Sequence, residues 1–345
     1  MKPEREFRVA LCGYYGFGNL GDELLAEGLL AALEGCGIRR GEIAMLSASP
    51  EESELAHGVR SVSRWSPRAV FQILRRSETL LLGGGGLFQD VTSLRSPFYY
   101  WGVIRLALLA GARPWCAGQS VGPFLTKSGT LLARSALGSC SVRGVRDCRS
   151  AALLAEWGAD SVVTCDPVFS LALPVAPPRR GSSLLVNIRP WTGDLARRTA
   201  EESARLASAR SLTLAGFALS AEDAEVMEDL RRTGVFPAER IVLLGAGNWR
   251  NECTRLFPEA DGVVAMRFHA SILALLFGRP LTAVVYDPKV ESLASEWALP
   301  SWSGSGALPE PSPPMRRIGP SESGAEFLET FSEMCAAAVR RDGKE

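Results

Sequence analysis

Short apolar runs alternate along the chain with segments that are apolar at every third or fourth position. In the first half, runs that predict strands cover Phe7–Cys12, Glu42–Leu46, Thr79–Leu82, Pro114–Gly118, Ser141–Arg146 and Ser161–Cys165. Helical periodicity is found at Glu23–Leu33, Tyr100–Ala110 and Ser150–Trp157, and Asp22 is the expected N-cap of the first of these helices. This alternation predicts a parallel sheet with helices on its faces.

The same alternation restarts after a segment rich in Pro, Gly and Ser. Strands are predicted at Leu184–Arg189, Leu212–Phe217, Ile241–Leu244, Gly262–Met266 and Leu281–Tyr286, and an amphipathic helix at Ser323–Arg340. We therefore expect an N-terminal domain at 1–173, a linker at 174–183, a C-terminal domain at 184–320 and a C-terminal helix at 321–345. The predicted fold class is α/β, with two doubly wound Rossmann-like domains and a cleft between them. In such sheets, ligands bind beyond the carboxyl ends of the strands.

Composition narrows the class of protein. The 345 residues carry 38 Lys and Arg against 38 Asp and Glu, so the basic footprint of a nucleic-acid-binding protein is absent. No apolar stretch follows the charged N-terminus, and we expect no signal peptide. Eight cysteines without a CxxC pair and only two histidines argue against a metal site and favour the reducing cytoplasm.

Three glycine-rich segments follow predicted strands. In Gly13–Glu23, the residues Gly16, Gly18 and Gly21 spell GxGxxG, but the second strand lacks the acidic residue of a dinucleotide site, so a tight turn remains the alternative. Gly83–Asp90 contains four consecutive glycines, which suggest the close approach of a ligand to the backbone. Crowded strand–helix packing would explain one of them. Together with a third segment, Gly118–Phe124, these two glycine-rich segments predict one continuous binding surface.

Basic residues gather near the strand ends predicted for the second domain. Arg267 and His269 flank one residue just after a buried strand, and Arg189 and Lys289 follow two other strands. Such a group suits a small anion that carries phosphate and carboxylate. His269 is either a general acid or base or a hydrogen-bonded residue at a helix start. His57, in a polar segment (Glu51–Gly58) that we expect to be a loop, is expected at the surface, and no carboxylate pair predicts a Mg²⁺ site.

Taken together, these motifs resemble the polysaccharide pyruvyl transferase family, in particular its bacterial cell-wall (CsaB) type. The resemblance rests on seven segments in order: Gly13–Glu23, Gly83–Asp90, Gly118–Pro123, Val145–Asp147, Arg189–Trp191, Met266–His269 and Tyr286–Lys289. Two positions depart from the common pattern, Phe268 where Leu is usual and Gly18 where Asn is usual. The resemblance implies a fold similar to the glycosyltransferase-B type and transfer of pyruvate from phosphoenolpyruvate to a sugar as a cyclic ketal, with no required cofactor.

The resemblance also implies roles for individual residues. His269 would be the catalytic acid, with Asp22 or Asp90 as the base. Phosphoenolpyruvate would bind to Arg146, Arg189, Arg267 and Lys289. We assign the acceptor to the glycine-rich segments, at Gly16, Asn19, Gly84, Gly85, Gln89 and Gln119. In the cell-wall type, the acceptor is an N-acetylmannosamine of a lipid-diphosphate-linked disaccharide, and the finished polymer anchors S-layer proteins.

Other interpretations remain open at this point. A glycosyltransferase that uses a nucleotide-linked sugar would need acidic residues to bind the ribose, and Glu291 and Glu296 could supply them. A nicotinamide oxidoreductase and a non-catalytic glycan- or anion-binding protein are the further alternatives. The segment from His57 to Ser77 carries five arginines with interleaved apolar residues, which suggests peripheral contact with the inner face of the membrane. An ordinary solvated arginine face is the alternative to that contact.

Overall fold

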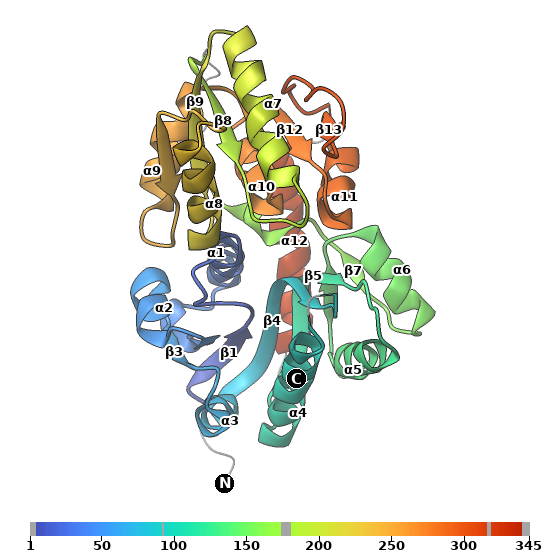
Figure 1. Ribbon diagram of the computed structural model, residues 1–345. Helices are drawn as coiled ribbons and strands as arrows, with labels where there is room; N and C mark the ends of the chain where they lie inside the picture. The colour runs from blue at the N-terminus through green and yellow to red at the C-terminus, as the bar shows by residue number, and fades with distance from the viewer. Residues whose placement is uncertain (1–4, 92, 174–180, 316–318, 340–345) are drawn as a thin grey trace. The chain divides into compact units, whose positions relative to one another are not determined.

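The computed structural model describes residues 5–91, 93–173, 181–315 and 319–339, which form two compact units (Figure 1). Within these ranges, the first unit comprises the residues up to Phe17, Asp22–Leu171 and the residues from Glu322 onward. The second comprises Gly18–Gly21 and the residues between Ala172 and Ser321. Most of the predicted linker, residues 174–180, lies outside the described residues, and Ser183 already begins a strand.

The first unit is built on a fully parallel seven-stranded sheet, as the alternation predicts. Its order is β3-β2-β1-β4-β5-β6-β7. The strands are β1 (Phe7–Cys12), β2 (Ile43–Ser47), β3 (Arg60–Ser63), β4 (Ser77–Phe88), β5 (Arg113–Val121), β6 (Arg143–Val145) and β7 (Val162–Val163). From Val9 to Cys12 in β1, alternate residues face opposite cores, because successive side chains of a strand point to opposite faces of its sheet.

Helices cover both faces of this sheet. One core contains residues of α3 (Pro67–Arg75), α4 (Arg95–Ala110), α5 (Lys127–Gly138) and α6 (Cys148–Glu156). The other contains residues of α1 (Leu20–Gly35) and of α12 (Pro320–Val339), which contributes Phe327, Phe331 and Met334, and Phe331 packs against Trp115. The remaining elements are α2 (Pro50–His57) and the short 3-10 helices η1 (Arg40–Glu42) and η2 (Pro167–Ser170).

The second unit has a parallel six-stranded sheet of order β10-β9-β8-β11-β12-β13. Its strands are β8 (Ser183–Asn187), β9 (Thr213–Ala218), β10 (Arg240–Leu243), β11 (Ala260–Ala265), β12 (Leu281–Val284) and β13 (Ser301–Trp302). Its helices are α7 (Leu195–Ala209), α8 (Ala221–Arg232), α9 (Trp249–Leu256), η3 (Phe257–Glu259), α10 (Phe268–Leu276) and α11 (Pro288–Glu296). Two sheets with alternating helices confirm the predicted fold class.

Three local predictions are wrong. The glycines after Leu82 do not leave the sheet, because Gly83 and Gly85 continue the ladder with β5. Asp22 is the third residue of α1 rather than its N-cap, and the Asn19 side chain instead accepts a hydrogen bond from Gly21 N at 3.3 Å. The segment around His57 is not a loop but helix α2, whose buried residues are the polar Ser53 and His57.

The basic segment before Ser77, for which membrane contact and a solvated arginine face were the two interpretations, is folded into the first unit. It contains β3 and α3, and the apolar side chains Val70, Ile73 and Leu74 are buried in the core. Arg64 is buried as well, whereas Trp65 remains exposed. Among the helices of the described ranges, none has the length and apolar character needed to cross a bilayer.

Candidate functional site

The glycine-rich segments of the first unit gather where β1, β4 and β5 end, because these strands are neighbours in the sheet. A Cβ on Gly83 would lie 2.0 Å from Tyr15 Oη, one on Gly13 2.3 Å from the Tyr15 ring, and one on Gly84 2.7 Å from Leu25. Crowded packing therefore explains at least two of the four consecutive glycines, Gly83 and Gly84, whereas we expected it to explain only one. Gly85 differs, since its φ of +95° favours glycine, and a Cβ there would lie 3.7 Å from Asp22 Oδ1.

A buried charged network fixes the first glycine-rich segment. His57 is buried, contrary to our prediction, and its Nε2 lies 2.9 Å from Glu23 Oε2, while its Nδ1 lies 3.5 Å from Glu27. Glu23 also accepts a hydrogen bond from Gly16 N at 2.8 Å. Burial lowers the pKa of His57, but hydrogen bonds and charges from Glu23 and Glu27 outweigh it and raise the pKa to about 9. The imidazolium thus positions the carboxylate that holds the loop.

Asp90 and Gln119 also serve the backbone around the glycine-rich segments. Asp90 accepts hydrogen bonds from Leu125 N at 2.5 Å and from the amide and hydroxyl of Thr126 at 2.9 and 2.5 Å. Burial raises the pKa of Asp90, but these hydrogen bonds more than offset it, and the net pKa is lowered. Gln119 donates to Gly83 O at 2.8 Å, and Gln89 Oε1 accepts from Val91 N. These contacts tie Asp90 to the turn that begins α5.

Arg146 belongs to the first unit, whereas the other predicted donor-binding cations belong to the second. Its guanidinium forms a buried ion pair with Asp166, and its Nε donates to Ser120 Oγ at 2.8 Å. Both side chains are almost completely buried. The structure therefore gives Arg146 a partner at the end of β6, and its role toward the donor stays a prediction.

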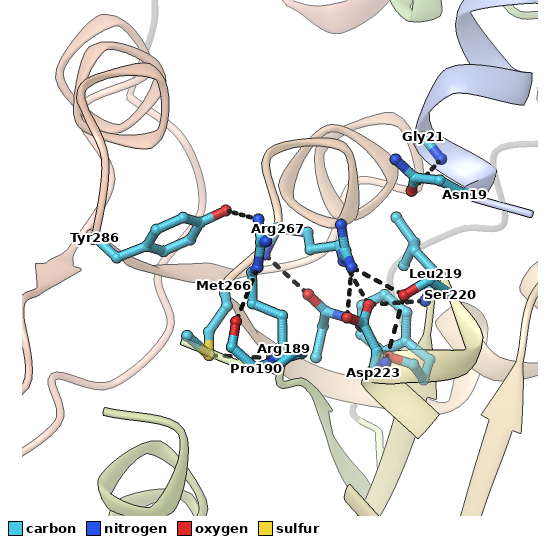
Figure 2. Close-up of polar contacts among 12 residues, drawn as sticks. Asn19, Gly21, Arg189, Pro190, Leu219, Ser220, Asp223, Met266, Arg267 and Tyr286 are labelled. Carbon is cyan, nitrogen blue, oxygen red and sulfur yellow. Dashed lines mark hydrogen bonds and ion pairs between the residues drawn. The ribbon is translucent and has the colours of Figure 1, made fainter. Parts of the chain in front are cut away.

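In the second unit, polar side chains meet at the carboxyl ends of four neighbouring strands, β9, β8, β11 and β12 (Figure 2). Arg267, just after β11, donates from Nε and Nη2 to the two carboxylate oxygens of Asp223 at 2.5 and 2.6 Å. The same Nη2 donates to Ser220 Oγ at 2.9 Å, and Arg267 N donates to Asn187 Oδ1 at 2.9 Å. A fully buried carboxylate thereby fixes the guanidinium in a two-point geometry.

Arg189 lies at the same strand ends but has neutral partners. Its Nη1 donates to Tyr286 Oη at 3.0 Å and its Nε to Pro190 O at 3.4 Å. The guanidinium also lies 5.2 Å from the ring centroids of both Trp191 and Tyr286. Burial raises the pKa of Tyr286, and the positive charge of Arg189 opposes that rise. These partners orient Arg189 without cancelling its charge.

His269 and Lys289 occupy the first turns of α10 and α11. A Cβ on Gly21, which groups with the second unit, would lie 2.3 Å from His269 Nδ1, so only glycine at this position leaves the imidazole where it is. The Phe268 ring packs edge-on against the imidazole at 5.2 Å. Lys289 follows Asp287, whose side chain caps α11 by accepting from Lys289 N at 3.0 Å. The unit thus carries Arg189, Arg267, His269 and Lys289 after three strands of one sheet.

Sequence reasoning missed Asp223, Asn187 and Tyr286 at this site. Ser220 and Asp223 have the spacing of a helix N-terminal cap, and Asn187 is a polar residue that ends an apolar strand, so both had a weak signal. Tyr286 begins the last motif segment, Tyr286–Lys289, but nothing in the sequence pairs it with Arg189. In the part of the chain that the structure describes, no three His, Cys, Asp or Glu side chains are placed to hold a metal ion together.

The fold and these strand ends define an α/β protein with two parallel sheets, each covered by helices. Residues 19–288 match the family model "Polysaccharide pyruvyl transferase", and the chain belongs to this family. It is therefore a transferase, and pyruvyl transfer onto a polysaccharide is the activity of its family. The predicted resemblance is confirmed at the level of the family.

Solved structures show the same fold at low sequence identity. UDP-GlcNAc 2-epimerase from Methanocaldococcus jannaschii superposes with a TM-score of 0.62 at 7% identity, covering 95% of this chain and 100% of that one. The UDP complex of MnaA from S. aureus superposes with a TM-score of 0.57 at 10% identity, covering 96% of this chain and 91% of that one. A glycosyltransferase from Rickettsia africae superposes with a TM-score of 0.56 at 10% identity, covering 95% of this chain and 93% of that one. No curated protein matches the sequence.

Proposed function

We propose that this transferase moves pyruvate from phosphoenolpyruvate to two hydroxyls of a glycan, forming a cyclic ketal and releasing phosphate. The observation that carries the proposal is the gathering of Arg189, Arg267, His269 and Lys289 at strand ends of one sheet in a chain of the pyruvyl transferase family. Phosphoenolpyruvate carries a phosphate and a carboxylate, and guanidinium and ammonium groups bind both.

The cations have different partners, which suggests different roles. Arg189 is held by neutral groups, so its charge is available to an anion, and we assign it with Lys289 to the phosphate and carboxylate. Asp223 compensates the charge of Arg267 and fixes its orientation, which favours a role in aligning the donor.

In the proposed reaction, His269 donates a proton to the methylene carbon of phosphoenolpyruvate. The adjacent carbon, C2, gains oxocarbenium character, and a sugar hydroxyl forms a C–O bond to it while a base removes the hydroxyl proton. A second hydroxyl then attacks C2, the bond from C2 to the phosphate oxygen breaks, and phosphate leaves with the second proton. No electrons are exchanged, so the proposed reaction needs no redox cofactor.

We assign the base to Asp22 rather than to Asp90. Asp90 already accepts three hydrogen bonds, and its lowered pKa makes it a poor proton acceptor. Asp22 lies at the glycine-rich segments that we assign to the acceptor and directly follows Gly21, the residue that packs on His269.

For the acceptor, we propose the glycan of the cell-wall type, an N-acetylmannosamine in a lipid-diphosphate-linked disaccharide. The enzyme would then act in the cytoplasm at the inner face of the membrane, where such a lipid is accessible, and its product would anchor S-layer proteins. The motif resemblance, from Gly13–Glu23 to Tyr286–Lys289, supports this choice.

The test is phosphate release from phosphoenolpyruvate with a panel of sugar acceptors. The wild type should release phosphate only with an acceptor, and in D₂O the product methyl should carry one deuterium. His269→Ala should lower turnover by about 10²–10⁴-fold, whereas the exposed control Arg197→Ala in α7 should not. Turnover of a nucleotide-linked sugar without phosphate release from phosphoenolpyruvate would contradict the proposal.

A further inference from the structure

Three aromatic side chains are exposed together at the carboxyl edge of the first sheet. Tyr14 and Phe17 follow β1 and are 43% and 37% exposed, and Trp65 follows β3 and is 63% exposed. We call these three residues the aromatic patch. Large aromatic rings contribute most to stability when they are buried, and the carboxyl edge is where α/β sheets bind their ligands. The position of the patch therefore points to a ligand rather than to the core.

The rings of the patch form two flat surfaces at nearly a right angle. Tyr14 and Phe17 stack with their centroids 3.9 Å apart and their planes 9° from parallel. Trp65 lies 6.0 Å from Phe17 at an angle of 85°. The stacked pair and the indole of Trp65 thus lie nearly perpendicular to each other.

A buried arginine holds the aromatic patch in place. Arg64 is only 5% exposed, and its guanidinium carbon lies 5.1 Å from the centroid of Phe17 and 5.4 Å from that of Trp65. It donates to Gly13 O at 2.7 Å, which fixes the loop that carries Tyr14 and Phe17. It also packs 4.3 Å from the Tyr99 ring. The cation–π contacts thus fix the rings before any ligand arrives, which lowers the entropic cost of binding.

We propose that the aromatic patch is a subsite for a sugar ring of the acceptor glycan, with a C–H face of the pyranose stacked on these rings. This inference rests on the proposed function. The negative face of an aromatic ring attracts the weakly positive C–H groups of a sugar.

The surroundings favour a sugar over a lipid chain. A lipid chain needs a continuous apolar surface, whereas two rings of this patch belong to the glycine-rich segment Gly13–Glu23, and the exposed, charged Arg68 follows Trp65 by three positions in the chain. The patch also continues along the chain into Asp22, our proposed base, within the same segment Gly13–Glu23. Two rings of the patch and the proposed base thus belong to one glycine-rich segment of the chain.

The experiment measures sugar binding and turnover in parallel. Saturation-transfer NMR with methyl N-acetyl-β-mannosaminide gives the affinity of a single sugar without turnover. Phosphate release gives the KM of acceptor and of phosphoenolpyruvate. The variants are Trp65→Ala and Phe17→Ala, with Leu131→Ala as the control, an apolar residue of α5 that is 65% exposed.

Trp65→Ala and Phe17→Ala should each weaken glycoside binding and raise the acceptor KM about three- to tenfold. The KM of phosphoenolpyruvate should not change, and Leu131→Ala should behave as wild type. Equal glycoside affinity in wild type and both patch variants would overturn the proposal. So would loss of binding to phosphatidylglycerol vesicles in these variants with glycoside binding intact, which would assign the patch to a membrane. If phosphate is never released, the proposed function fails, and the NMR titration still decides on the patch.

Discussion

Replacing His57 with Gln tests whether a buried imidazolium stabilises the first unit. The pKa of His57 rises from an ordinary 6.5 to about 9 because Glu23 and Glu27 surround the ring. At about 1.4 kcal/mol per factor of ten in proton affinity, this corresponds to about 3 kcal/mol of stability. The side chain is almost completely buried, so solvent does not screen the interaction appreciably. Glutamine can keep one hydrogen bond to Glu23 but no charge.

The sign of the pH dependence follows from the raised pKa. Because the folded chain binds the proton more tightly than the unfolded chain, the stabilisation is complete below pH 6.5 and is lost as the pH rises through 9. The lowered pKa of Glu27, about 2 against an ordinary 4.5, acts oppositely, and its contribution is lost as the pH falls below 4.5 toward 2. Burial alone would raise the pKa of Glu27, but the hydrogen bonds from His57 and Arg40 lower it by more. The full effect of His57 is therefore expected between pH 4.5 and 6.5.

The assay is the melting temperature of wild type and His57→Gln between pH 5 and 10, measured by calorimetry. A loss of about 3 kcal/mol should lower the Tm of the first unit by roughly 6–12 °C near pH 6, and this gap should shrink above pH 9. Glu52→Gln, an exposed change in the same helix, should show little gap at any pH. A gap at pH 10 as large as that at pH 6 would refute the charged state of His57.

Three further predictions concern other contacts. Asp223→Ala should cost about 3–5 kcal/mol, because it leaves Arg267 without its buried carboxylate. In a calorimetric double-mutant cycle with Arg267→Ala, the two losses should not be additive, and simple additivity would contradict the pairing. Gly21→Ala should lower kcat about 10–100-fold, because the new methyl group displaces His269, whereas Gly35→Ala in the same helix meets no atom within 4 Å. Equal turnover of these two variants would count against that contact. Asp90→Asn should destabilise the first unit by about 1–3 kcal/mol, seen as a lower Tm, because an amide cannot accept all three hydrogen bonds. An unchanged Tm would show that these hydrogen bonds contribute little.

The sheets could be predicted from the sequence because their strands are short apolar runs. Phe7–Cys12 coincides with β1, and the predicted strands of the second unit differ from the observed ones by only a few residues. Helix α2 was missed because its sequence, PEESELAH, has no apolar face, and its buried positions are Ser53 and His57. The sequence pattern predicts a loop for the glycines of β4 because glycine usually ends strands, yet here they leave space for Tyr15 and Leu25.

The candidate site could be predicted in part. The strand-end positions of Arg267 and His269 can be derived from the pattern, because both follow an apolar run that ends at Met266. Their partners could not be derived, since Asp223 is distant in sequence and looks like an ordinary helix-start acid. The buried arginine of the aromatic patch had no sequence signal either, because arginine is usually exposed and neighbours in space are needed to predict otherwise.

The packing of α12 has a consequence for the order in which the protein can fold during synthesis. The helix follows the second unit in the chain, yet Phe327, Phe331 and Met334 belong to a core of the first unit. A ribosome that has just released residues up to Leu171 therefore presents a sheet with Trp115 still uncovered. The first unit to be synthesised is completed last, so a nascent chain must carry an exposed apolar surface until the residues of α12 emerge.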